Sequence, residues 1–329
     1  RTDSSAASDV YKRQDWDRAI GIIAKTLDAL RNPDDAYFYT SGRASNEAAY
    51  LWQLLARQYG TNNLPDCSNM CHESSGVALN ESIGIGKGTV RLEDFDKADL
   101  IVVVGQNPGT NHPRMLSALK SAKKSGASVL SINPLKETGM RRFRHPQSPI
   151  DMLGAGTQIS DDHVDIKVNG DMALFRAIGS IILDKGVHDM DFINLNTTGF
   201  LDYANIARAV DWGLTEDLTG QSRDRIYEIS DYFCRSKRTI VCWAMGITQH
   251  KNSVNTIREI MNVLLLKGDI GREGSGPCPV RGHSNVQGDR TVGITHAPGK
   301  FFIEKLSKEF DIDIPPEHGA DSVNAVMRM

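Results

Sequence analysis

The chain has 329 residues, and its 38 lysines and arginines nearly balance its 41 aspartates and glutamates, for a formal charge of −3. This balance argues against nucleic acid or an acidic membrane surface as a partner, and the apolar runs are too short to span a bilayer. Hydrophobic residues make up 40% and charged residues 24%, a globular composition that predicts two domains at this length.

Both ends of the chain and its cysteines give further expectations. Residues 1–14 are small and polar, and we interpret them as a non-native leader, with a disordered native arm as the alternative. The chain stops at Met329 within an apolar-periodic segment, so we expect a fragment of a longer protein. Five cysteines, an odd number, argue against a disulfide scaffold and favour a cytoplasmic, reducing location.

Strand-like and helix-like segments alternate along the chain. A short aromatic run at 36–40 predicts a strand, and apolar residues at three- and four-residue spacing predict a helix over 45–59, capped by Ser45 and ended by Gly60. The later predicted elements are the strands 100–104, 128–132, 163–168 and 239–243 and the helices 113–124, 172–185, 224–235 and 254–266. This alternation predicts an α/β fold in which helices cover parallel sheets.

Four loops are rich in glycine and neutral polar residues, at 105–114, 133–145, 244–250 and 271–290. The first three follow predicted strands directly, and the carboxyl ends of parallel strands are where open sheets bind ligands. Such residues supply unusual backbone angles and neutral hydrogen bonds. Ordinary turn chemistry would explain any one loop, but the four together predict a large, polar, phosphate-bearing ligand.

A basic cluster lies within the second of these loops and consists of Lys136, Arg141, Arg142 and Arg144. Guanidinium groups just after a strand end can clamp phosphates. A run of charges can equally be a solvated face, and both interpretations stay open.

The densest run of reactive side chains is DCSNMCHESSG at 66–76. It places Cys67, Cys71, His72 and Glu73 within eight positions of Asp66. A thiolate followed by a histidine suits a soft transition metal, or a thiolate nucleophile beside a proton acceptor. A turn with two packed cysteines is the alternative, whereas a structural zinc site would need further ligands at finger-like spacing.

This run is followed in order by GQNPGTNHPR, an asparagine–proline at the next strand end, MGITQ and VRGHSNVQGDR. Together these motifs resemble the molybdopterin oxidoreductases, most closely the formate dehydrogenase alpha-subunit-like branch associated with acid resistance. The resemblance covers about residue 15 to the end. It implies two parallel-sheet, Rossmann-like domains, the second inserted in the first: 15–66 plus 284–329, and 67–283.

The resemblance implies a molybdenum or tungsten ion held by two molybdopterin guanine dinucleotides. Cys71 takes the metal-ligand position, His72 that of the neighbouring proton acceptor and Arg281 that of the group holding a substrate carboxylate. These residue types fit the chemistry, because a thiolate is a soft ligand, imidazole titrates near neutral pH and a guanidinium binds carboxylates bidentately.

The resemblance also implies which residues bind the pterin, pyrophosphate and guanine groups, with Asp171 on a guanine base. These are Gly105, Gln106, Asn107, His112, Asn133, Pro134, Asp171, Met245, Gly246, Gln249, Gly282, His283, Asn285 and Gln287.

The expected reaction is a two-electron oxidation of a small molecule, by analogy formate, and the fragment alone is expected to be inactive. His283 stands where typical formate dehydrogenases have glutamine, so another small acid or aldehyde is an alternative substrate. No cysteine cluster precedes Cys67, so a 4Fe–4S cluster and an electron-transfer partner would depend on a missing N-terminal region. A non-catalytic structural or electron-transfer subunit that keeps the fold without the metal is the second hypothesis.

Overall fold

The computed structural model describes residues 15–148 and 154–329, so the predicted leader at 1–14 lies outside the described residues. The chain divides into two compact units. Unit 1 joins the residues before Met70 to His283–Met329, and unit 2 is the continuous segment Met70–Gly282. Within the described ranges, no helix has both the length and the hydropathy to cross a bilayer.

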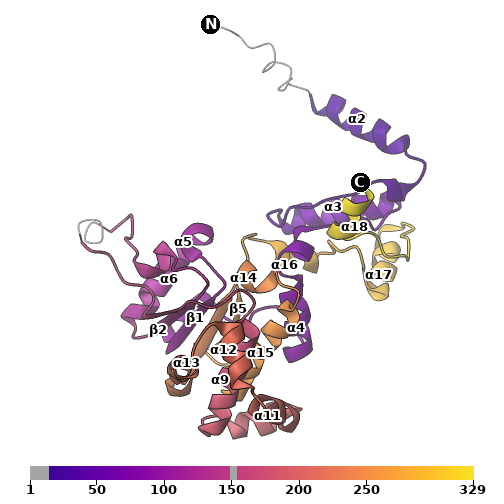
Figure 1. Ribbon diagram of the computed structural model, residues 1–329. Coiled ribbons are helices and arrows are strands. Elements are labelled where there is room, and N and C mark those ends of the chain that lie inside the picture. The colour runs from indigo at the N-terminus through magenta and orange to yellow at the C-terminus, as the bar shows by residue number, and fades with distance from the viewer. Residues whose placement is uncertain (1–14, 149–153) are drawn as a thin grey trace. The chain divides into compact units, whose positions relative to one another are not determined.

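Unit 2 is built on a parallel sheet of five strands in the order β3-β2-β1-β4-β5 (Figure 1). The strands are β1 Leu100–Val104, β2 Ser128–Ile132, β3 Asp162–Val164, β4 Thr239–Trp243 and β5 Gly276–Pro279. The central strand β1 is buried along its whole length, as a continuous β-branched run predicts for a strand covered on both faces. The α/β class with a parallel sheet is confirmed.

Helices cover both faces of this sheet. One face packs against α4 (Glu73–Ile83), α9 (Asp171–Asp184), α13 (Arg223–Arg235) and α15 (Ser253–Leu266), and alternate side chains of β1 point into their core. The other face packs against η3 and α6. The remaining elements of unit 2 are η3 Leu92–Lys97, α5 Pro108–Asn111, α6 Pro113–Lys124, α7 Thr138–Arg141, α10 Met190–Asn196, α11 Phe200–Arg208, α12 Trp212–Thr219 and α14 Met245–Thr248.

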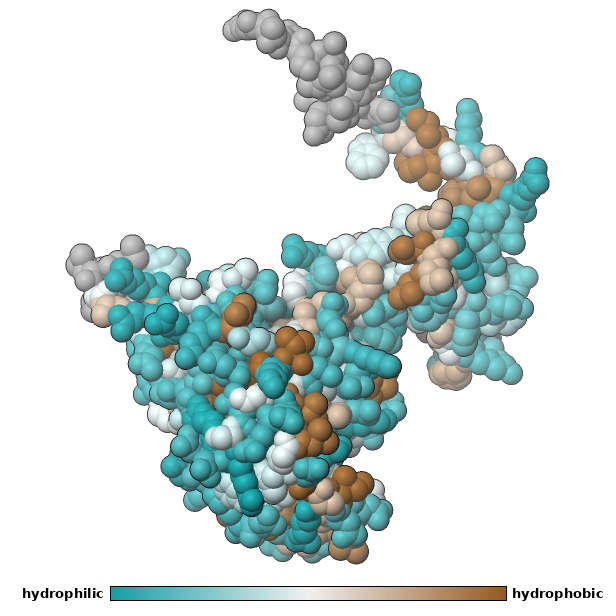
Figure 2. Space-filling model, in the orientation of Figure 1, coloured by the Kyte–Doolittle hydropathy of each residue, from teal (hydrophilic) through white to brown (hydrophobic). Residues whose placement is uncertain are grey.

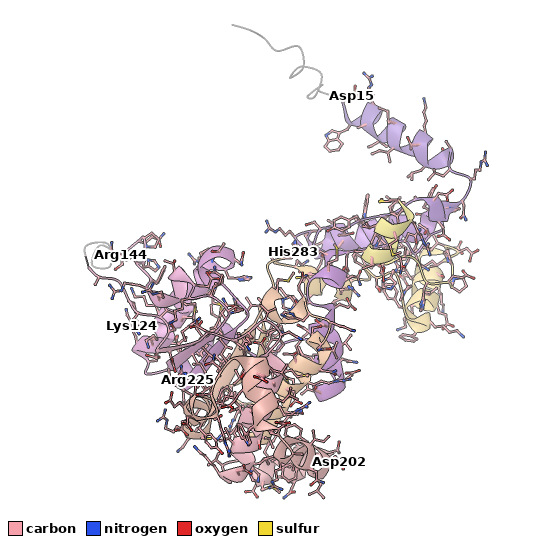
Figure 3. The ribbon with its side chains drawn as sticks, in the orientation of Figure 1. Asp15, Lys124, Arg144, Asp202, Arg225 and His283 are labelled. Carbon is pink, nitrogen blue, oxygen red and sulfur yellow. The ribbon has the colours of Figure 1, made fainter. Side chains whose placement is uncertain are left out.

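The two edge strands differ from the sequence-based expectation. The predicted loop 271–290 contains β5, whose prolines Pro277 and Pro279 are tolerated because an edge strand pairs on one side only. The predicted strand 163–168 is shortened to β3, which pairs with β2 over three residues. Arg225 of α13, labelled in Figure 3, forms an ion pair with Asp162 of β3 at 2.6 Å, which ties this edge to the helical layer.

Unit 1 is mainly helical. Its elements are α2 Trp16–Asp28, η1 Pro33–Asp35, α3 Asn46–Tyr59, α16 Val286–Thr291, α17 Lys300–Phe310 and α18 Ser322–Arg328, with η2 Cys67–Met70 at the junction with unit 2. The predicted helix is confirmed as α3: Ser45 Oγ accepts from the Ala48 amide at 3.3 Å, and Gly60 ends the helix at a φ of 106°.

The second parallel sheet expected from the sequence is not formed by the described residues of unit 1. Residues 36–40 run beside 61–66 without forming a ladder. Their backbones meet in an isolated parallel bridge between Thr40 and Asp66 and in a 2.9 Å hydrogen bond from the Phe38 amide to the Asn63 carbonyl, and Asn63 Nδ2 donates to the Ala36 carbonyl at 3.2 Å. Pro65 has no amide hydrogen and therefore interrupts the ladder.

Helix α2 is amphipathic, yet it buries none of its residues. Asp15 caps it by accepting from the Arg18 amide at 2.7 Å. Ile20, Ile22 and Ile23 are about half exposed or more, and apolar side chains gather along this helix in Figure 2.

Candidate functional site

Two glycines bring the loops after β1 and β4 into backbone contact. The Gly246 amide donates to the Gly105 carbonyl at 2.9 Å. A Cβ on Gly105, whose φ is 55°, would lie 2.8 Å from the Gly246 carbonyl carbon, and a Cβ on Gly246 would lie 2.6 Å from the Gly105 Cα. No larger residue fits at either position. The crossing places Gln106 and Met245, both predicted cofactor-binding residues, on loops that touch.

The predicted metal ligand Cys71 lies in the segment that leads into α4 and is half-buried. Its Sγ is 3.6 Å from the Sδ of Met245, at the start of α14. Gln249, just after α14, donates from Nε2 to the Met70 carbonyl and so holds the segment before the thiol. Within 15–148 and 154–329, no three His, Cys, Asp or Glu side chains converge in a metal-binding group.

His72 is buried, and both of its ring nitrogens face protein groups. Nδ1 is 2.9 Å from Ser75 Oγ, and Nε2 is 3.0 Å from the Val280 carbonyl oxygen. Burial, and after it the nearby charge of Arg281, lower the pKa of His72 to about 4. The ring is therefore neutral at pH 7, and its role as proton acceptor stays a prediction.

Arg281 follows Val280 and is only partly exposed. Burial lowers its pKa, and the charges of Cys71 and Cys278 oppose that shift. Its Nη1 is a buried donor without a hydrogen-bond partner in the described part of the chain. The carboxamide oxygen of Gln106 is likewise a buried acceptor without a partner there, although Gln106 Nε2 is 3.3 Å from His112 Nδ1. Buried polar atoms are normally paired, so these two atoms fit a polar ligand.

The polar loops after β1 and β2 meet through Glu137. Its carboxylate accepts from Asn107 Nδ2 at 2.6 Å and from Asn133 Nδ2 at 3.5 Å. Asn107 and Asn133 are thus brought together, and Pro134 beside them is exposed. Sequence analysis missed Glu137, although a carboxylate four residues after Asn133 was the available signal.

The predicted guanine-binding residue Asp171 begins α9 and is buried. Burial raises its pKa from 3.8 to about 6, while a backbone hydrogen bond and the charge of His250 act against the shift. The carboxylate is therefore held at a cost in folding free energy when it is ionised.

Replacing Asp171 by asparagine is expected to stabilise the protein at pH 8 by about 1–3 kcal/mol, the linkage value of a two-unit shift. Because folding favours the protonated acid, its stabilising contribution is present below pH 4 and is lost as pH rises through about 6. The variant should therefore match the wild type near pH 4. Urea unfolding at the two pH values checks this, and a destabilised Asp171→Asn at pH 8 would contradict it.

Three predicted cofactor-binding residues lie in unit 1: His283, Asn285 and Gln287. Asn285 Nδ2 donates to the Ala44 carbonyl at 2.8 Å and to Asn46 Oδ1 at 2.9 Å, so its amide anchors the start of α16 to α3. Gln287 is exposed, and Gly282, the last residue of unit 2, has open space where a Cβ would be.

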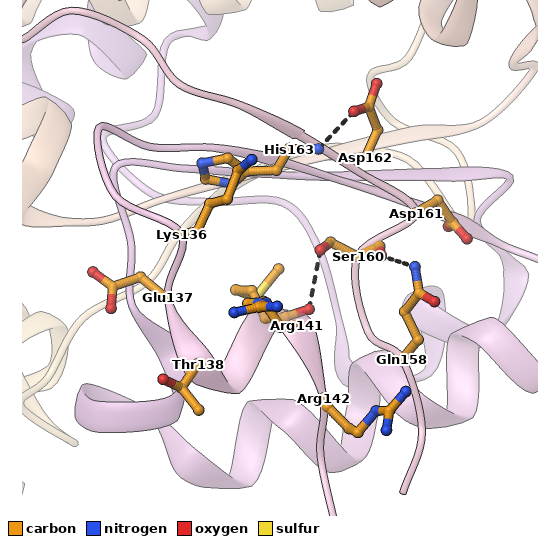
Figure 4. Close-up of a pocket in the computed structure, with 11 residues that line it drawn as sticks. Lys136, Glu137, Thr138, Arg141, Arg142, Gln158, Ser160, Asp161, Asp162 and His163 are labelled. Atoms are coloured by element: carbon orange, nitrogen blue, oxygen red, sulfur yellow. Dashed lines mark hydrogen bonds between the residues drawn. The ribbon is translucent and has the colours of Figure 1, made fainter. Parts of the chain in front are cut away.

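The basic cluster borders a cavity of about 800 Å³ beside α7 (Figure 4). Lys136, Arg141 and Arg142 line it, and Arg144 does not. Lys136 Nζ lies 3.8 Å from Asp165 Oδ2. Arg141 and Arg142 are exposed. Phosphate binding by this cluster stays a prediction.

Residues that the sequence analysis did not single out complete the surroundings of His72. They are Ser75 in the first turn of α4, Trp243 at the end of β4 and the backbone of Val280. The three-residue spacing of His72 and Ser75 at a helix start was a usable signal, but the contacts of Trp243 and Val280 leave no pattern in the sequence.

The family model described as Molybdopterin oxidoreductase matches residues 6–315. The chain is 50% identical over 327 residues to the "Uncharacterized oxidoreductase Rv2900c" of Mycobacterium tuberculosis, covering 98% of this chain and 42% of that protein. It is 45% identical to "Protein YdeP" of Escherichia coli K12, covering 96% of this chain and 43% of that protein.

Formate dehydrogenase H of Escherichia coli K12 is 30% identical over 316 residues, covering 92% of this chain and 42% of that protein. Acetylene hydratase from Pelobacter acetylenicus has a similar fold, with a TM-score of 0.66 and 17% identity over 80% of this chain and 34% of that chain. The chain thus spans about two fifths of the length of the curated relatives named here.

Proposed function

Because the chain belongs to the molybdopterin oxidoreductase family, we propose that it supplies the metal-binding thiolate and one substrate-binding group of a molybdopterin guanine dinucleotide enzyme. The full protein would oxidise formate or a similar small substrate by two electrons. One arrangement supports this proposal: the half-buried Cys71 thiol lies 3.6 Å from Met245 Sδ, on the loop after β4, and Arg281 has a buried Nη1 donor with no hydrogen-bond partner among the described residues.

Each residue contributes by ordinary chemistry. When bound, the molybdenum or tungsten cofactor supplies the two-electron redox centre. Cys71 is the soft thiolate that holds the metal. Arg281 binds a carboxylate bidentately, and its burial strengthens that attraction because less water competes. The unpartnered oxygen of Gln106 accepts from a donor group of the ligand, while Asn107, Asn133 and Asp171 line the region proposed for the dinucleotide.

The experiment that tests this function is metal and nucleotide analysis of the full-length protein. Molybdenum or tungsten near one atom per chain, with guanine nucleotide released by acid, is the expected result. A folded protein without either metal would favour the alternative, a structural or electron-transfer subunit. Iron analysis of the same sample tests for a 4Fe–4S cluster, which this proposal does not require.

His283 is the proposed determinant of substrate preference. Its half-buried side chain packs on the backbone near Gly42, where a Cβ would lie 2.9 Å from the His283 Cβ. His283→Gln is expected to shift the kcat/KM ratio toward formate by about tenfold, the size of one altered pocket contact. A panel of small acids and aldehydes measures this ratio, and an unchanged ratio would remove His283 as a determinant.

A further inference from the structure

Four hydrogen bonds form a closed circuit around His72. Trp243 Nε1 donates to Ser75 Oγ at 2.9 Å, and Ser75 Oγ lies 2.9 Å from His72 Nδ1. His72 Nε2 lies 3.0 Å from the Val280 carbonyl, and the Val280 amide donates to the Trp243 carbonyl at 2.8 Å. The circuit therefore begins and ends at Trp243, the last residue of β4.

The chemistry of these groups permits only one direction of donation for a neutral ring. An indole nitrogen only donates, and a carbonyl oxygen only accepts. Val280 therefore requires the proton of His72 on Nε2, which leaves Nδ1 as an acceptor. Ser75 must then donate its hydroxyl proton to Nδ1 while its oxygen accepts from Trp243.

The circuit links the two groups proposed to act on the ligand. Cys71 precedes His72, and Arg281 follows Val280, so the bond from His72 to Val280 joins the backbone segments that carry the thiol and the guanidinium. Trp243, Ser75 and His72 are all buried, which protects these bonds from exchange with water. His72 also begins α4 without making a side-chain capping bond to the helix.

We propose that Ser75 and Trp243 are positioning residues that hold His72 as the Nε2–H tautomer and thereby fix Cys71 relative to Arg281. The assignment of the tautomer does not depend on the proposed function. The expectation that fixing Cys71 matters for catalysis does rest on the proposed function. His72 in this arrangement is a structural link between the two chain segments.

The test is nitrogen NMR of the full chain carrying ring-labelled histidine, with His72 assigned from the signals lost in His72→Gln. In the wild type, Nε2 is expected to give a protonated, pyrrole-type signal and Nδ1 a pyridine-type signal displaced by hydrogen bonding. In Ser75→Ala, the chemical shift of Nδ1 is expected to move to the value of a nitrogen that accepts no hydrogen bond. The signal of the Trp243 indole is expected to shift as well. Ser74→Ala is the matched control and should change neither signal.

Protonated Nδ1 in the wild type, or nitrogen signals of His72 unaffected by Ser75→Ala, would overturn the proposal. If Ser75→Ala does not fold, Trp243→Phe removes the indole donor together with part of a buried ring, and the Nδ1 signal of His72 should then shift while Nε2 keeps its proton. In the metal-loaded full-length enzyme, Ser75→Ala is expected to keep its metal and to lose about tenfold or more in kcat/KM. A wild type without metal but with the Nε2–H tautomer would refute the proposed function and leave the tautomer established.

Discussion

Replacing Cys71 by alanine in the full-length protein is expected to reduce turnover at least about a hundredfold, because the metal would lose its protein ligand. The free energy of unfolding should change by less than about 0.5 kcal/mol, since the thiol is half-exposed and lies at the edge of the fold. Formate oxidation, metal stoichiometry and thermal unfolding of the same preparations separate the two effects.

Cys67→Ala is the matched control for this variant. Its thiol is buried in the same short segment, so its removal should cost stability and leave the metal in place. Wild-type turnover and an unchanged metal signal in Cys71→Ala would end the ligand assignment.

Replacing Arg57 by alanine is expected to lower the free energy of unfolding by about 3–5 kcal/mol, the range of a large core truncation that also leaves polar groups unpaired. Arg57 is fully buried in α3, and its guanidinium donates to the carbonyls of Gly293 and Thr295 at 3.1 Å each. It also lies 5.7 Å from the centre of the Phe302 ring. Burial lowers its pKa to about 10, so it remains charged at pH 7.

Arg57→Met distinguishes volume from hydrogen bonding at this position. Methionine fills most of the space and removes the buried charge. Arg57→Met should therefore lower the free energy of unfolding by less than Arg57→Ala does. Urea unfolding of both variants measures the difference, and an alanine variant within 1 kcal/mol of the wild type would show that the two carbonyls find other partners.

The sequence predicted the central part of the sheet well and its edges poorly. The strands 100–104, 128–132 and 239–243 are mainly apolar, are ended by glycine, asparagine–proline or a polar loop, and are buried along almost their whole length, which makes their pattern easy to recognise. Edge strands carry weaker patterns, so Pro277 and Pro279 concealed β5. The helices between 190 and 219 are short, and their stability comes from packing that local periodicity does not reveal.

For the site, the sequence motifs indicated candidate reactive groups but not their surroundings. The roles of Cys71 as a metal ligand and of Arg281 as a carboxylate-binding group follow from the family resemblance and stay predictions. The state of His72 could not be predicted, because its burial and its bond to a backbone carbonyl follow from the meeting of α4 with the end of β5. Ser75 and Glu137 each had a local sequence signal, but their contacts with Trp243 and Asn107 depend on the tertiary fold.

The crossing of Gly105 and Gly246 couples the polar loops that follow β1 and β4. Since their backbones touch with no side chain between them, neither loop can shift by even a methyl group's width without pushing the other. A larger residue at either glycine would therefore push the two loops apart. A design that grafts either loop onto another parallel sheet would have to include both loops.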